Sequence, residues 1–387
     1  MNNQMRWRTP ALTLAAALCL GLGASVREQS LRDAAQASGL LIGTAVRPAQ
    51  LSEAAYAATL AREFNMLEPE DALKWEVVHP ERQSFDFSQA DQIVDFATRH
   101  GIKVRGHTLV WHHQNPKWLT EGQFSSAELA EILEQHIKTV VGHYRGKIFA
   151  WDVVNEAFDE LHPGTLRSTI WRDQPGIGLA ENGTAASSDS RAASKPDRSE
   201  LETRSQKQSY NYMERCFRWA HEADPQALLF YNEAEAETEN AKSDAIYAMV
   251  RDFRERSVPI DGVGFQMHIA NLHADVASIS ANIARFTALG VQVHITEMDV
   301  ALPVDSNGNA RPGDLQLQAD IYGEIATACV SHPGCTAIQT WGFTDKYSWI
   351  GSHSKKTQGA ALPFDRNYQT KPACEALRNA LERARSR

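Results

Sequence analysis

The sequence predicts an α/β protein, a single-domain (β/α)8 TIM barrel, from three observations. The chain has 387 residues and 43% hydrophobic content, which is enough for one barrel of ordinary size. From about residue 40 onward, short apolar runs alternate with amphipathic helical runs, in eight pairs. The apolar runs are nearly continuous, as expected of parallel strands covered on both faces. Eight such pairs favour a closed barrel over an open, doubly wound sheet.

The expected strands follow one another at regular intervals, and turn or cap signals separate them from the helices. Ser125 and Glu128 form a capping box that predicts a helix start. A second helix is expected to be capped at Ser88 and to end at Gly101. A last helical segment at 372–385 completes the eighth pair. The expected strands are 40–46, 64–68, 103–110, 148–155, 227–231, 262–267, 292–298 and 337–341.

One stretch, residues 173–208, interrupts this alternation. It is rich in small and charged residues, poor in large apolar ones, and lacks a clear period. We interpret it as a long insertion after the fourth strand. Such a loop lies at the C-terminal face of a barrel, where active sites form. It could shape one side of a cleft, or it could be inert, and the sequence does not decide between the two.

The N-terminus is typical of a secretory signal. Arg6 and Arg8 precede an apolar run at 11–22, and Gly21 and Gly23 offer the small residues that a signal peptidase accepts. The run of about a dozen residues is too short to span a bilayer. We therefore expect a signal peptide at 1–24 and a barrel domain at 25–387. The mature protein would be secreted, either extracellular or periplasmic, with no membrane attachment.

Charge and cysteine content narrow the possible partners and ligands. A net charge of −9 excludes the basic surface that nucleic acid requires. Cys329 and Cys335 lie six positions apart around a Pro-Gly turn, so a disulfide is expected there in an exported protein. Cys216 and Cys374 could simply be buried small hydrophobes. No residue spacing predicts a metal site, and no cofactor is expected.

Two expected strands end in a carboxylate within a polar cluster. Glu156 closes the fourth strand in the sequence 151–157, and Glu297 closes the seventh in the sequence 294–299. Two facing carboxyl groups suit cleavage of a glycosidic bond, one as proton donor and one as nucleophile. A retaining enzyme holds them about 5–5.5 Å apart. Each glutamate alone could be a strand-end residue in a salt bridge, but the pair favours catalysis.

Six ordered motifs carry a resemblance to a known family. The sequence resembles glycoside hydrolase family 10, the xylanase family, over about residues 40–376 apart from the insertion. This resemblance implies retaining endo-hydrolysis of β-1,4-xylosidic linkages in xylan by double displacement, by a protein expected to be monomeric and to bind xylan and xylo-oligosaccharides. The motifs are LKW at 73–75, VRGHTLVWH at 104–112, WDVVNEA at 151–157, GFQMH at 264–268, ITEMD at 295–299 and TWGFTDKYSW at 340–349.

The resemblance also implies residue roles. Glu156 matches the family's acid/base and Glu297 its nucleophile. Asn155 matches the residue that holds the 2-hydroxyl of the sugar. Gln266 and His268 match residues that hold the nucleophile and the adjacent sugar, and the residue expected to support this network is Asp299. The side chains that match the glycone-side polar and aromatic walls are Glu70, Lys74, His107, Trp111, Gln114, Trp341 and Trp349.

Two positions depart from the family pattern. Asp71 follows Glu70 where Asn is usual, and an ionised Asp cannot donate a hydrogen bond to a sugar. Ala234 replaces an aromatic residue that would line the leaving-group side. We expect weaker or pH-dependent glycone binding from the first change. From the second, together with the insertion, we expect altered product lengths or altered preference for decorated substrates.

Three alternative functions remain open at this point. A related barrel glycosidase could act on other β-1,4-glycans, such as cellulose. A non-catalytic xylan-binding protein could have the same fold, although loss of one glutamate would then be expected, and both are present. An exo-acting enzyme could have one end of its cleft closed by the insertion.

Overall fold

The computed structural model describes Met1, residues 29–177 and residues 210–384 of the chain. The expected signal peptide at 1–24, apart from Met1, lies outside the described residues. The expected insertion at 173–208 lies outside them from residue 178 onward. Within the described ranges, no helix is both long enough and apolar enough to cross a membrane.

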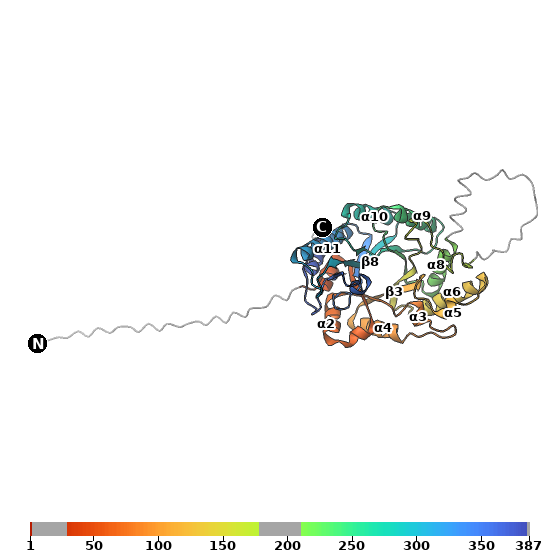
Figure 1. Cartoon of the computed structure of the whole chain (residues 1–387), viewed down its shortest axis with the longest axis horizontal. Helices are drawn as coiled ribbons and strands as arrows, with labels where there is room; N and C mark the ends of the chain where they lie inside the picture. Colours follow the sequence, from red (N-terminus) through yellow and green to blue (C-terminus); the bar gives the residue numbers. More distant parts are fainter. Residues whose placement is uncertain (2–28, 178–209, 385–387) are drawn as a thin grey trace, which may run out of the picture.

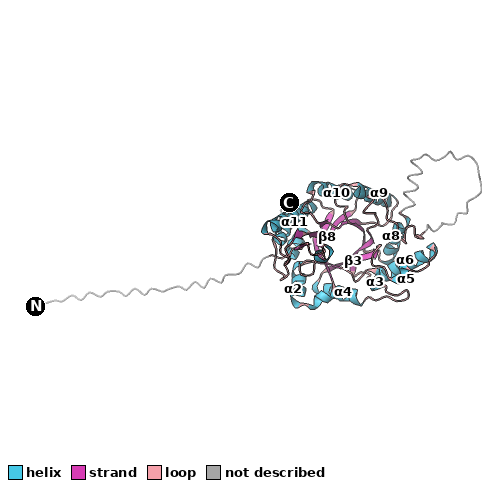
Figure 2. Ribbon diagram, viewed as in Figure 1, coloured by secondary structure: helices cyan, strands magenta, loops and turns pink. Residues whose placement is uncertain are grey.

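Eight parallel strands close into a barrel, as the sequence predicted, and helices surround it (Figure 1, Figure 2). Hydrogen bonding runs in chain order around the ring, and the last barrel strand pairs with the first, with Leu41 opposite Ala337. In chain order the barrel strands are β1 Leu41–Val46, β2 Met66–Pro69, β3 Lys103–Val110, β4 Ile148–Asn155, β5 Leu228–Glu233, β6 Gly262–Phe265, β8 Gln292–Val300 and β10 Cys335–Thr340.

Helices cover the outside of the barrel and shorter elements lie in the loops. The longer helices are α1 Leu31–Ser38, α2 Ala54–Glu63, α4 Ser88–His100, α6 Ser126–His143, α8 Asn211–Ala223, α9 Ala241–Glu255, α10 Val276–Ala288, α11 Pro312–Val330 and α13 Pro372–Ala384. The short elements are η1 Pro48–Ser52, α3 Trp75–Val78, α5 Lys117–Thr120, α12 Ile350–His353, β7 His268–Ile269, β9 Leu302–Pro303 and β11 Gln358–Gly359.

The helix-capping signals identified in the sequence agree with the structure in all but one case. Ser125 caps α6 in the expected capping box with Glu128. Gly101 ends α4 in the left-handed conformation, at φ 61°. The expected cap at Ser88 is wrong, because Ser88 is already the first helical residue and its amide donates to Oδ1 of Asp86 at 2.9 Å. The aspartate two positions earlier takes the capping role.

The predicted disulfide between Cys329 and Cys335 is confirmed. It joins the end of α11 to the start of β10, at the end of the barrel away from the strand termini that carry the glutamates. Cys216 and Cys374 are both buried, as small hydrophobes are.

Candidate active site

The two predicted catalytic glutamates both lie at the C-terminal end of the barrel. Glu156 follows the last residue of β4 and is half-buried, while Glu297 lies within β8 and is only 5% exposed. They come from strands four and seven of the ring. The carboxyl ends of parallel barrel strands meet at one face, so residues distant in sequence converge there.

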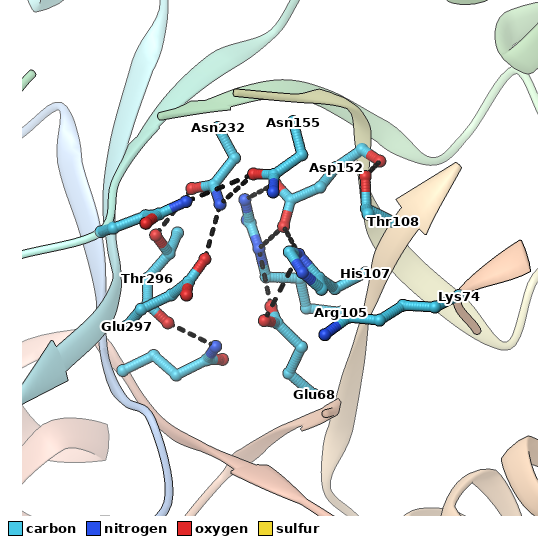
Figure 3. Close-up of polar contacts among 12 residues, drawn as sticks. Glu68, Lys74, Arg105, His107, Thr108, Asp152, Asn155, Asn232, Thr296 and Glu297 are labelled. Atoms are coloured by element: carbon cyan, nitrogen blue, oxygen red, sulfur yellow. Dashed lines mark hydrogen bonds and ion pairs between the residues drawn. The ribbon is translucent and has the colours of Figure 1, made fainter. Parts of the chain in front are cut away.

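Three amide side chains connect the two carboxyl groups. Gln266 Nε2 donates to Glu156 Oε1 at 2.8 Å and lies 3.4 Å from Asn155 Oδ1. Asn232 Nδ2 donates to the same Asn155 oxygen at 2.9 Å and to Glu297 Oε1 at 2.7 Å (Figure 3). A continuous line of hydrogen bonds therefore runs from one glutamate to the other.

The orientation of the Asn232 amide is fixed by its neighbours. Its oxygen accepts from the Thr296 hydroxyl at 2.7 Å, so its nitrogen must face Glu297 (Figure 3). Gly264 leaves the room for this arrangement, because a β-carbon at that position would collide with Asn232 Oδ1. The glycine at the start of the GFQMH motif is thus required for close packing beside the site.

His268 holds the other side of Glu297. Its Nε2 lies 3.3 Å from Glu297 Oε2, and its Nδ1 lies 3.0 Å from Asp299 Oδ2, which also accepts from Trp349 Nε1 at 2.8 Å. Burial alone would lower the pKa of His268, but the carboxylates of Asp299 and Glu297 outweigh it and raise the pKa well above its usual value. A protonated His268 donates to both acids and fixes the Glu297 carboxyl in one orientation.

Glu156 lies on a sharp backbone turn. Its φ of 53° is in the left-handed region, which a non-glycine residue seldom adopts. Its amide donates to the Asn232 carbonyl at 3.0 Å, and Trp111 Nε1 donates to Glu156 Oε2 at 2.7 Å. The turn directs the carboxyl out of the strand toward the cleft, where Trp111 and Gln266 each bind one oxygen.

Charged and aromatic residues border the site on the side of strands β1 to β3. The Lys74 ammonium lies 4.8 Å from the ring centre of Trp111 and 5.6 Å from that of Trp341. Lys74 is also 3.3 Å from Asp71 Oδ1. Arg47, at the end of β1, contacts Glu70 at 2.6 Å and Asp71 at 3.1 Å, so the unusual aspartate lies between two cations.

A fully buried ionic cluster lies beneath these residues, inside the barrel (Figure 3). Arg105 binds Asp152 through two nitrogens, and its Nε lies 3.1 Å from Glu68. His107 Nδ1 lies 3.0 Å from Asp152 and so is held with its ring edge toward Trp341. Burial raises the pKa of Glu68 to about 8, although His107 and Arg105 act in the opposite direction. Asp152, which the sequence analysis did not single out, therefore positions His107.

Within the described ranges, Glu68, His107 and Asp152 are close enough together to offer ligand atoms to a metal ion, within 4.8 Å of one another. The guanidinium of Arg105 already occupies the position between the two acids. A cation at that point would meet the arginine charge directly, so the cluster fits an ion-pair network better than a metal centre.

Gln114 lies beside α3, the short helix that directly follows Lys74. Its side-chain amide donates to Glu76 Oε1 at 2.9 Å. Sequence reasoning missed Asn232 and Arg47. Both lie at or just beyond the ends of barrel strands, the position that drew attention to Asn155, so the same signal was present for them.

Ala234 lines a cavity of about 360 Å³ beside His268 and Trp349. Glu160 and Glu235 add carboxyl groups to its wall. The small side chain at 234 therefore leaves space next to the residues that hold Glu297.

The barrel and its paired glutamates, joined by amides at the C-terminal face, define a glycoside hydrolase of the type that acts through two carboxylic acids. The chain belongs to glycosyl hydrolase family 10, whose family model matches residues 30–380. The relationship predicted from the six motifs is thus confirmed.

Individual relatives agree with this assignment. The chain is 42% identical to endo-1,4-beta-xylanase B of Thermotoga neapolitana over 327 residues, 84% of this chain and 83% of that protein. It is 37% identical to the beta-1,4-xylanase of Dictyoglomus thermophilum, with 82% of each covered. The crystal structure of native xylanase 10B from Thermotoga maritima superimposes with a TM-score of 0.80 at 39% identity, covering 92% of this chain and 99% of that one. The crystal structure of xylanase 10B from Thermotoga petrophila in complex with xylobiose superimposes with a TM-score of 0.79 at 39% identity. It covers 92% of this chain and 97% of that one.

Proposed function

We propose that this protein is a retaining endo-1,4-β-xylanase that cleaves linkages within xylan and binds xylo-oligosaccharides. The observation that carries the proposal is the hydrogen-bonded line from Glu156 through Gln266, Asn155 and Asn232 to Glu297. It holds two carboxyl groups in one mouth of the barrel. The names of the relatives, all family 10 xylanases or β-1,4-xylanases, supply the substrate class.

The proposed reaction proceeds by two displacements. Glu297 attacks the anomeric carbon as a carboxylate while Glu156 delivers a proton to the leaving oxygen. A covalent xylosyl–enzyme bond forms and the leaving chain departs. Glu156 then takes a proton from water, the water attacks the same carbon, and Glu297 is released with the original configuration restored at the sugar. Asn155 lies between both acids, where it can hold the 2-hydroxyl of the reacting sugar.

The test compares wild type with Glu156→Ala and Glu297→Ala on glucuronoxylan, arabinoxylan and carboxymethylcellulose, with products followed over time. We expect wild type to release mixed-length xylo-oligosaccharides early from both xylans and to leave the cellulose derivative intact. Both variants should lose xylan hydrolysis. Xylose as the sole early product would indicate exo action, and faster turnover of the cellulose derivative would indicate a glucanase. Unchanged xylan turnover by either variant would refute the assigned pair.

We further propose that Ala234 sets product length through the cavity beside His268. The substitution Ala234→Tyr would fill part of that space and restore the aromatic residue that the family resemblance places on the leaving-group side. Product ratios from linear xylo-oligosaccharides should then change. Identical ratios in wild type and variant would remove the basis for this role.

We propose that the protein is exported and acts as a monomer outside the cytoplasm. Arg6, Arg8 and the apolar run at 11–22 support export, and so does a disulfide between Cys329 and Cys335. N-terminal sequencing of the protein from the culture fluid and size-exclusion chromatography would test the two statements. A retained residue 1 or a dimer mass would contradict them.

A further inference from the structure

The turn that carries Glu156 is short, irregular and largely buried. It comprises residues 156–158, which follow β4 directly, and Ala157 and Phe158 are 4% and 1% exposed. Because water does not reach such a segment freely, its amide and carbonyl groups need partners within the protein. Those partners determine where the Glu156 side chain begins.

All three amides of the turn donate to consecutive residues of β5. The Glu156 amide donates to the Asn232 carbonyl at 3.0 Å and the Ala157 amide to the Tyr231 hydroxyl at 3.0 Å. The Phe158 amide donates to Glu233 Oε2 at 3.2 Å. One neighbouring strand thus fixes the turn through one backbone oxygen and two side chains.

Arg167 donates hydrogen bonds to all three carbonyl groups of the same turn. Its amide donates to the Ala157 oxygen at 2.8 Å, and its guanidinium reaches the Glu156 and Phe158 oxygens at 3.4 and 3.2 Å. Every amide and carbonyl of the three residues therefore has a partner.

Glu233 supports two of the three amide contacts. Its Oε2 accepts from Phe158 and also from the Tyr231 hydroxyl, at 2.5 Å, which orients that hydroxyl toward the Ala157 amide. Its Oε1 accepts from the Ala234 amide at 3.2 Å and lies 3.6 Å from the Lys242 ammonium. The side chain is fully buried, and its hydrogen-bond and ion-pair partners among the described residues are all donors.

We propose that Glu233 is a positioning residue for the acid/base: through Tyr231 and Phe158 it holds the backbone turn that places the Glu156 carboxyl at the leaving oxygen. This rests on the proposed function of Glu156 and adds to it a second carboxyl group that touches neither substrate nor Glu156 itself. Nothing in the substrate cleft needs to contact Glu233 for this role.

The role has a signature that loss of folding would not produce. Protonation of the leaving oxygen matters for a xylose chain, which is a poor leaving group, and matters little for 2,4-dinitrophenolate, which departs unprotonated. Displacement of the acid should therefore slow xylohexaose cleavage and spare the first step on 2,4-dinitrophenyl β-xylobioside. The second step, which needs Glu156 as a base, should slow on both substrates.

The experiment compares wild type with Glu233→Gln, Tyr231→Phe and the control Glu255→Gln. Glutamine replaces one acceptor oxygen with a donor, and phenylalanine removes only the hydroxyl. Glu255 ends α9, the helix that also carries Lys242, and it faces Arg251 at 4.0 Å with its side chain 70% exposed. For Glu233→Gln we expect kcat/KM on xylohexaose to fall at least tenfold. On the dinitrophenyl substrate kcat/KM should change less than twofold, with kcat and KM falling together and an initial burst of dinitrophenolate.

Tyr231→Phe should give the same pattern with a smaller loss, and it decides the matter if Glu233→Gln does not fold. Glu255→Gln should behave as wild type. Equal losses on the two substrates, or no loss on xylohexaose, would overturn the positioning role. Wild type that leaves xylohexaose intact would instead overturn the proposed xylanase function.

Discussion

The two halves of the active site hold their glutamates in different ways. Glu297 lies within the regular strand β8 and is fixed by side chains, Asn232 on one oxygen and His268 on the other. Glu156 lies on a turn with φ of 53°, and the backbone of that turn is fixed by β5 and Arg167. Each carboxyl group has two side-chain contacts. The proposed nucleophile is distinguished by its charged partner His268, and the proposed acid/base by the support of its irregular main chain.

This difference suits the two chemical roles. A nucleophile acts on one carbon throughout the reaction, so a rigid carboxyl with charged support favours it. An acid/base first faces the leaving oxygen and then a water molecule. Its two side-chain contacts, from Trp111 and Gln266, are both with neutral donors. Together with the firmly held turn they keep that carboxyl in place while leaving it able to serve both partners.

The largest expected effect is that of Glu156→Ala, whose loss of rate should depend on the leaving group of the substrate. On xylan this variant should lose about 10²- to 10⁴-fold in kcat/KM, the usual contribution of general acid catalysis. On 2,4-dinitrophenyl β-xylobioside the first step should survive, and added azide should restore turnover by replacing the activated water. Steady-state rates with both substrates, with and without azide, measure this.

Glu297→Ala provides the contrast for that experiment. Without a nucleophile neither substrate can form the covalent bond, so both rates should be lost whatever the leaving group. If the two variants showed the same leaving-group dependence, the division into two halves would be wrong.

The second test concerns His268, which belongs to the nucleophile half. His268→Gln removes a cation beside Glu297 and Asp299, and kcat/KM should fall about 10- to 100-fold, as for the loss of a hydrogen bond to a charged group. The fall should be similar for xylohexaose and the dinitrophenyl substrate, unlike that of Glu233→Gln. His143→Gln is the control, because His143 also pairs with an aspartate, Asp91 at 3.0 Å, but on the outer helix α6.

The same division explains what the sequence alone could predict. Of the residues that support Glu297, His268 and Asp299 lie in two of the six motifs and were assigned through the family resemblance, whereas Asn232 was missed. Tyr231 and Glu233 support Glu156 from within β5 and are buried there. A backbone hydrogen bond and a buried carboxyl leave no periodic pattern, so a sequence interpretation assigns them to the core.

The fold shows a parallel contrast. The eight barrel strands were predictable because each is a buried apolar run, and those of β3 and β4 match residue for residue. The other barrel strands begin or end at different residues than predicted, because hydrogen bonding to neighbouring strands sets their ends. The two-residue strands β7, β9 and β11 carry no signal of their own, since their pairing depends on loops already placed by the barrel.

The third test concerns Arg47, which belongs to neither half of the site. Its loss should affect substrate binding alone. Arg47→Ala leaves Glu70 and Asp71 without their shared cation on the β1–β3 side. KM for xylotetraose should rise about two- to fivefold, the range of a partly exposed ion pair, while kcat stays constant. Arg62→Ala is the control, because Arg62 is equally exposed and pairs with Glu63 on α2. A fall in kcat would place Arg47 within the chemistry of the site instead.

The smallest expected effect is a change in the pH dependence of stability, and it tests Glu233 by a property other than rate. Burial raises the pKa of Glu233 from 4.5 to about 8; Lys242 and Tyr231 oppose the increase, and the Glu156 carboxylate adds to it. Between these two values the folded protein binds a proton that the unfolded chain has released. The stability due to this group is therefore complete below the lower value and is lost as pH rises through the upper one.

Between pH 5 and pH 9 the melting temperature of wild type should therefore change by a few degrees more toward lower stability than that of Glu233→Gln. Glu255→Gln should follow wild type. Parallel curves for Glu233→Gln and wild type would mean that the carboxyl is as easily ionised in the fold as in water. In that case Glu233 would hold its turn as a permanent anion, so the main-chain support of the acid/base would not weaken at acid pH.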